Sequence, residues 1–235
     1  MNETQRFRGL VRSTLMSIRC QKIAISLDTL TITGTDYAYI ALAMLERPDN
    51  VVGMSVRAEN QGGASASMRP SNPAAGQPIA AFSIPIKPWF AGTYHEEMII
   101  VHESTHASFE ARTGLALRAL TNEALAYLAD AMYNKLGSPG DPVFDPVNGE
   151  RPPPAKKLTQ ESRNVLIAAS NLARLAIGRP NGTITRAEIS VIENAVANHP
   201  IYADLKANPS LTDTSRGIRL ARTPSIDPAV RHVLR

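Results

Sequence analysis

Two histidines and a glutamate in one short stretch offer the clearest chemistry in this chain. They form the pattern His102-Glu103-x-x-His106, which lies within residues 93–113. On a helix, side chains four residues apart lie on the same face, so His102 and His106 can bind one metal ion together. Glu103 lies about 100° around the helix from His102, where its carboxylate can reach a metal-bound water. A zinc hydrolase needs this arrangement.

The residues around the pattern predict that it lies on a buried helix. Thr93 and Glu96 form a capping box at the start, and Glu96 and Glu97 place negative charge in the first turn. Gly114 is typical of a helix end. Most residues in between are apolar on every side of the helix, which indicates burial. Buried histidines need partners, so they are either core histidines hydrogen-bonded to neighbours or metal ligands. The complete pattern favours a metal site.

A second helix, predicted from about residue 115 to 136, supplies a third ligand. Glu123, Tyr127 and Asp130 lie along one of its faces, at steps of four and three residues. Ala119 and Ala126 flank them and are small enough for a neighbouring helix to approach closely. We expect Glu123 to bind the metal. Two histidines and one glutamate leave the fourth position of a zinc ion open for water.

Composition bounds the class of protein. The chain has 235 residues, of which 43% are hydrophobic and 20% charged, and this balance predicts a soluble globular protein. The net charge of +4 is too small to indicate nucleic-acid binding. Cys20 is the only cysteine, so a metal must be held by nitrogen and oxygen ligands. No apolar run approaches the roughly 20 residues that a membrane span requires.

The start of the chain bears on localisation. Residues 23–27 are too short for the apolar part of a secretory signal, so we expect a cytoplasmic protein or one exported without an N-terminal signal peptide. Residues 4–27 have apolar side chains at helical spacing, with Arg8, Arg12 and Arg19 on other faces. Such a helix is either an ordinary surface helix or a targeting or membrane-surface helix. Nothing in the sequence indicates an oligomeric state.

A small β-sheet is predicted between this start and the motif helix. Thr35 is expected to cap a helix that ends near residue 46, and strands follow at 51–58 and 79–86. Pro85 confines the second strand to a sheet edge or to a strand end. An exposed edge there would bind an extended peptide as one more strand, as zinc peptidases do. A sheet that only covers the helix is the alternative.

The predicted fold class is α+β, mostly helical, and the chain divides into four regions. Residues 1–136 form the metal-binding catalytic region, and residues 137–157 are a proline-rich connection. Residues 158–209 form a helical C-terminal region, with a helix capped by Thr159 and a second opened by the capping box of Thr185 and Glu188. Residues 210–235 are predicted to be a basic tail.

With both helices in hand, the sequence resembles the zincin metallopeptidases, and within them the gluzincin pattern of H-E-x-x-H followed by a helical glutamate. Residues 122–124 resemble the Asn-Glu segment of thermolysin-like enzymes, and residues 122–131 resemble a helix of bacterial peptidases that cleave phage repressors. The sequence is also similar to bacterial H-E-x-x-H proteins of uncertain role, some of them attached to secreted toxins. The resemblance covers residues 93–136 and implies a zincin-like core around a bound zinc ion.

The sequence departs from thermolysin-like enzymes at one position. In those enzymes an aspartate four residues beyond the ligand glutamate orients a zinc-bound histidine, whereas this chain has Tyr127 there. Asp130, one turn further along the same face, is the residue we expect to make that contact.

The predicted function is zinc-dependent hydrolysis of a peptide or protein substrate. Zn²⁺ lowers the pKa of its bound water and polarises the scissile carbonyl, while Glu103 acts as general base. The candidates for stabilising the oxyanion are Tyr127, Tyr94, His95 and His199. Two alternatives remain: a non-catalytic binding module stabilised by zinc, and a secreted bacterial effector or toxin with the same chemistry. Neither the substrate nor the cleavage preference can be read from the residues.

Overall fold

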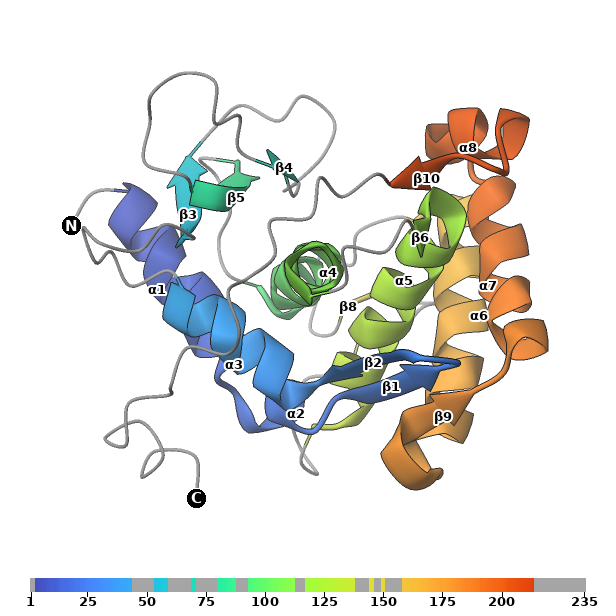
Figure 1. Cartoon of the computed structure of the whole chain (residues 1–235), viewed down its shortest axis with the longest axis horizontal. Coiled ribbons are helices and arrows are strands. Elements are labelled where there is room, and N and C mark those ends of the chain that lie inside the picture. The colour runs from blue at the N-terminus through green and yellow to red at the C-terminus, as the bar shows by residue number, and fades with distance from the viewer. Residues whose placement is uncertain are drawn as a thin grey trace.

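Figure 1 shows the computed structural model of the chain. It describes residues 3–43, 53–58, 69–70, 80–87, 93–112, 117–137, 144–145, 149–150 and 158–213. The described part is an α+β fold made mostly of helices, which confirms the predicted class. None of the described helices is long and apolar enough to cross a membrane.

Eight α-helices and two 3-10 helices make up most of the described chain. Their bounds are α1 Glu3–Leu15, α2 Ile18–Gln21, α3 Gly34–Ala43, α4 Tyr94–Arg112, α5 Ala119–Lys135, α6 Gln160–Ile177, η2 Pro180–Gly182, α7 Arg186–Ala197, η3 Pro200–Tyr202 and α8 Ala203–Ala207. The motif helix is α4, which begins after the capping box of Thr93 and Glu96 as predicted. The predicted caps of α6 and α7 are also present.

Helix α5 is the centre of the fold. It packs against α4 on one side and against α6 and α7 on the other (Figure 1). Thirteen of its 17 residues are buried, so its sides are almost entirely covered by neighbouring helices. Apart from Leu120 and Lys135, the residues that keep some exposure are Glu123 and Tyr127. These two are one turn apart on the predicted site face, which therefore opens toward solvent.

A small sheet directly precedes α4, as the sequence predicts. Its order is β3-β5-β4: β3 (Gly53–Ala58) runs parallel to the central β5 (Ala80–Ile86), and β4 (Arg69–Pro70) runs antiparallel to it. Pro85 lies beyond the two β5 residues that pair with β4, near the end of the strand. It therefore meets the restriction that a proline places on a strand.

A second sheet joins the N-terminal and C-terminal parts of the chain. β1 (Ala24–Leu27) and β2 (Leu30–Thr33) form a hairpin, and β9 (Thr183–Ile184) adds in parallel to β1. Gly182 precedes β9 with a φ of +62°, and a Cβ there would collide with the backbone carbonyl of Ala24. Only glycine allows both this conformation and this close approach.

The N-terminal prediction was wrong in part. Residues 4–27 do not continue as one helix, because α1 ends at Leu15 and the chain turns through α2 into strand β1. The hairpin turn contains Asp28 with a φ of +53° in place of a glycine, so it lacks the usual sequence signal.

Helix α3 begins at Gly34, one residue before the predicted cap Thr35. The cap contact is made by Asp36, whose carboxylate accepts from the Thr33 backbone N–H at 2.7 Å.

The C-terminal helices pack on the motif region and share one hydrophobic core with it. Buried Glu193 of α7 receives hydrogen bonds from Arg118 and from the hydroxyl of Thr121 at the start of α5. Beside them β6 (Leu117–Arg118) pairs with β10 (Thr212–Asp213), so the first residues of the predicted tail are part of the fold. The rest of the tail lies outside the described residues.

Most of the proline-rich connection also lies outside the described residues. Within it, β7 (Phe144–Asp145) pairs with β8 (Gly149–Glu150) in antiparallel fashion.

Helix α3 contacts the motif helix α4 through a buried hydrogen bond. The hydroxyls of Tyr37 and Thr105 lie 2.8 Å apart, and Tyr37 is fully buried. The Thr105 hydroxyl donates its one proton to the Val101 carbonyl, at 2.8 Å. Tyr37 must therefore donate to Thr105. Thr105 lies between His102 and His106 in the sequence, so this hydrogen bond holds α4 in place next to its two motif histidines.

We expect Tyr37→Phe to lower the free energy of unfolding by about 1 kcal/mol, the usual net value of one intramolecular hydrogen bond. Chemical denaturation measures this difference. Tyr39→Phe on the same helix is the matched control, because Tyr39 is only half-buried and we expect a much smaller effect. Equal losses in the two variants would contradict the role of the Tyr37 hydroxyl.

Candidate metal centre

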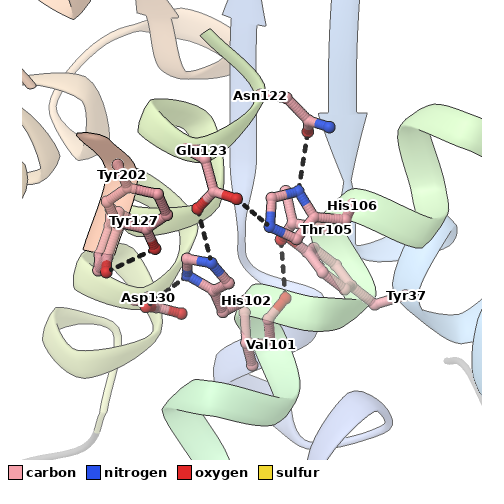
Figure 2. Close-up of polar contacts among 10 residues, drawn as sticks. All are labelled: Tyr37, Val101, His102, Thr105, His106, Asn122, Glu123, Tyr127, Asp130 and Tyr202. Carbon is pink, nitrogen blue, oxygen red and sulfur yellow. Dashed lines mark hydrogen bonds and ion pairs between the residues drawn. The ribbon is translucent and has the colours of Figure 1, made fainter. Parts of the chain in front are cut away.

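The motif histidines and Glu123 form a compact group of possible metal ligands. His102 and His106 lie one turn apart on α4, and Glu123 projects from α5 between them (Figure 2). One Glu123 oxygen lies 3.4 Å from Nε2 of His102, and the other lies 3.6 Å from Nε2 of His106. The three ligand atoms all fall within 4.8 Å of one another. This buried group can hold a metal ion.

The other ring nitrogen of each histidine is held by α5. Nδ1 of His102 lies 3.1 Å from Oδ2 of Asp130, and Nδ1 of His106 lies 3.0 Å from Oδ1 of Asn122. Both partner atoms are acceptors, so each Nδ1 carries the proton. In the neutral ring, Nε2 is then left with its lone pair toward the Glu123 side, which is the tautomer that a metal ligand needs.

These two contacts also fix the direction of the helices. Moving along α4 from His102 to His106 advances about 6 Å, while the partner on α5 moves backward from Asp130 to Asn122. Helices α4 and α5 therefore run in opposite directions where they cross. Glu123 follows Asn122 directly in sequence, so the contact that holds His106 also sets the position of the third ligand.

The electrostatics of the group suit a cation. Glu123 and Asp130 each have a buried carboxylate oxygen that makes no hydrogen bond to the described residues, Oε2 and Oδ1 respectively. Glu103 adds a third carboxylate close enough to raise the pKa of Asp130. A divalent ion would offset much of this negative charge. The donor set of two imidazoles and a carboxylate therefore fits a metal ion on charge as well as on geometry.

Burial and the two histidines shift the pKa values of the Glu123 and Asp130 carboxylates in opposite directions. Burial raises the pKa of Glu123, but His106 and His102 lower it by more, to about 2. Burial raises the pKa of Asp130 to about 6, because His102 only partly offsets the loss of solvation. Glu123 is thus ionised at neutral pH and ready to bind a cation.

The pKa of His102 stands well above the ordinary value for histidine. Burial lowers it, but the carboxylates of Asp130 and Glu123 raise it by more. Without a metal ion, His102 is therefore protonated at neutral pH and bridges the two carboxylates. A metal ion replaces the proton on Nε2.

Glu103 lies beside His102 on α4 and is half-buried. It does not belong to the compact group of His102, His106 and Glu123, and its carboxylate makes no hydrogen bond or ion pair with the described residues. His102, Glu103, Glu123 and Tyr127 all keep partial exposure while most of their neighbours are buried. Solvent therefore reaches the group from this side.

Tyr127 packs directly on the first motif histidine. Its ring meets the ring of His102 edge-on, with centroids 4.7 Å apart. Its hydroxyl lies 3.1 Å from the hydroxyl of Tyr202, which comes from η3 near the end of the described chain. Burial, together with the nearby charge of Glu123, raises the pKa of Tyr202, so this hydroxyl keeps its proton at neutral pH. Two phenols thus border the ligand group (Figure 2).

The other candidates for stabilising an oxyanion lie elsewhere. Tyr94 stacks on Tyr133, with ring centroids 5.8 Å apart. His95 is in the first turn of α4, about 10 Å of helix rise before His102. His199 contacts Ser162 through Nε2 at 3.0 Å. None of these three belongs to the ligand group formed by the described residues.

Comparisons with models of known protein families, with characterised proteins and with solved structures found no match. The case for a metal site therefore rests on this chain's own geometry.

Two residues of the centre are not predicted from the sequence. Asn122 belongs to the Asn-Glu segment of the resemblance, but the sequence assigns it no role. Its position one residue before Glu123 was the available signal, because it faces His106 once α4 and α5 cross. Tyr202 carried no signal, since it lies 75 positions after Tyr127 and only the packing of α5 with the C-terminal part brings them together.

We expect Asn122→Ala to weaken Zn²⁺ binding by about 10- to 100-fold, because His106 loses the contact that fixes its orientation. Competition with a chromogenic chelator measures the affinity. Asn134→Ala is the matched control: it removes a buried asparagine from the same helix, about three turns beyond Asn122 and one turn beyond Asp130. A loss of affinity as large in Asn134→Ala would contradict a specific role for Asn122.

We also expect metal affinity to rise with pH. Because the pKa of His102 is raised, the proton must leave before Nε2 can bind a metal, and this competition weakens as pH increases. The affinity should change by about tenfold per pH unit below the pKa of His102. Calorimetric titration at pH 6 and pH 8, in buffers of different ionisation enthalpy, measures both affinity and proton release. Equal affinities with no proton released would contradict this assignment.

Proposed function

We propose that this protein is a zinc-dependent peptidase. The observation that carries the proposal is the convergence of His102 Nε2, His106 Nε2 and a Glu123 oxygen, with both Nδ1 atoms already engaged by α5. A purely structural metal site is closed by four protein ligands, whereas this group offers three among the residues that the structure describes. The partial exposure of Glu103 and Tyr127 beside it supports a site that works on a substrate.

Zinc is the metal that the donor set favours. Two neutral imidazoles with one carboxylate are typical ligands of catalytic Zn²⁺, and the single cysteine is buried in the core away from the group. When bound, zinc would supply a Lewis acid for the scissile carbonyl and would lower the pKa of a water molecule toward about 7.

The chain's own residues would carry the proton transfers. Glu103 would accept a proton at its carboxylate from the attacking water and donate it to the leaving amine. The Tyr127 ring packs against His102, and its hydroxyl would donate to the developing oxyanion. Asp130 and Asn122 would keep the imidazoles in place throughout the reaction.

We further propose that the sheet β3-β5-β4 with α4 and α5 is a zincin-like core. The sheet directly precedes the motif helix, as the resemblance implies. An extended substrate would add to an edge of this sheet as one more strand.

The test is Glu103→Gln in the full chain. We expect the variant to bind Zn²⁺ as the wild type does and to lose at least about 100-fold of its rate of casein or peptide-library cleavage, because only the base is removed. Glu97→Gln is the matched control, since Glu97 lies on the same helix and accepts a hydrogen bond from Tyr133. It should keep both zinc and activity.

Two outcomes would contradict the proposal. Stoichiometric zinc without cleavage of any substrate by the wild type would indicate a zinc-stabilised binding module. Absence of zinc from the wild type, even after incubation with excess Zn²⁺, would remove the metal site altogether.

A further inference from the structure

Tyr202 reaches the candidate metal centre from the opposite end of the chain. It closes η3, the short turn after α7, and its hydroxyl lies 3.1 Å from that of Tyr127. The two rings meet edge-on, with centroids 6.4 Å apart and an interplanar angle of 88°. Its neighbour Ile201 is 69% exposed, whereas Tyr202 packs against the core. The turn therefore places a phenol at the site and leaves an apolar side chain in water, the reverse of what burial alone would favour.

The turn that carries Tyr202 is firmly anchored. Nδ1 of His199 accepts a hydrogen bond from the backbone N–H of Ile201 at 3.2 Å, so the ring proton is on Nε2. Nε2 must then donate to the hydroxyl of Ser162, 3.0 Å away. In this tautomer His199 has no lone pair toward Ser162 and cannot act as its base. The contact instead ties η3 to the first turn of α6.

The protons of the two phenols can be counted. Each hydroxyl has one proton to donate and can also accept. Only one of the two protons is needed for the hydrogen bond between them. When Tyr202 donates to Tyr127, the proton of Tyr127 stays available to a group bound beside His102. Without the Tyr202 hydroxyl, Tyr127 loses the partner that orients it.

We propose that Tyr202 is a positioning residue of the metal centre, whose hydroxyl orients the hydroxyl of Tyr127 where the Tyr127 ring packs against His102. The inference rests on the proposed metal-dependent function and adds the C-terminal part of the chain to its site. A residue that merely fills space beside α5 would need the ring of Tyr202 and not its oxygen. Removal of the hydroxyl alone separates these two roles.

The experiment compares Tyr202→Phe with the wild type, using Co²⁺ as the probe and the full chain. Phenylalanine keeps the ring and its packing. We expect Co²⁺ to bind about tenfold more weakly, as for loss of other contacts around metal ligands. We also expect its visible absorption to change in position or intensity, as Tyr127 and the His102 ring against which it packs reorient. Tyr133→Phe is the matched control, because it removes a phenol from α5 whose hydroxyl contacts Glu97 at 2.8 Å. It should leave both Co²⁺ readouts unchanged.

The outcomes separate this inference from the proposed function. A Tyr202→Phe protein with wild-type Co²⁺ affinity and spectrum would overturn the positioning role while leaving the metal site intact. A wild-type protein that binds no Co²⁺ or Zn²⁺ would overturn the proposed function, and the positioning role with it. Equal effects of Tyr202→Phe and Tyr133→Phe on Co²⁺ would show general loosening of α5 and would also overturn the inference.

Discussion

The hydrogen bonds from the two imidazole Nδ1 atoms to helix α5 are the contacts on which the candidate metal centre depends. Asp130 holds His102 and Asn122 holds His106. Each contact selects the tautomer with a free Nε2 lone pair and also restricts rotation of the ring. Because both partners lie on one helix, the same contacts set how α4 and α5 cross. That crossing brings Glu123 between the two imidazoles.

Such a centre requires that α5 stay in place, and the helices packed around α5 hold it there. The helix is covered by α4, α6 and α7, and the buried carboxylate of Glu193 ties its first turn to α7 through Arg118 and Thr121. Helix α4 is held in turn by α3, through the hydrogen bond between Tyr37 and Thr105. The ligands are thus supported by elements that lie before and after them in the sequence, which agrees with the need to orient a metal site to within fractions of an ångström.

The sequence predicts the parts of this structure that depend on local interactions. The capping boxes at Thr93 and Thr185 join residues three positions apart, and the faces that carry the motif and Glu123 follow from helical periodicity. Apart from the contact of Asp130 with His102, which the resemblance implied, residues paired across long separations could not be foreseen. Strand β9 joins β1 through packing more than 150 positions apart, and Asn122 acquires its partner only when α4 and α5 cross. The β1–β2 turn escaped prediction because Asp28 adopts a left-handed conformation without a glycine.

The proline-rich stretch at 137–157 divides the sequence by composition, but it does not divide the packing. Helix α6 follows that stretch and lies directly on α5, and its first turn carries Ser162, which holds His199 and hence the turn of Tyr202. A path of contacts therefore runs from α6 through η3 to the phenol pair and on to the ligand group. The Tyr127–Tyr202 contact joins α5 to η3, so it depends on how these two elements sit relative to each other. The C-terminal part thus belongs to the same structural unit as the motif helices.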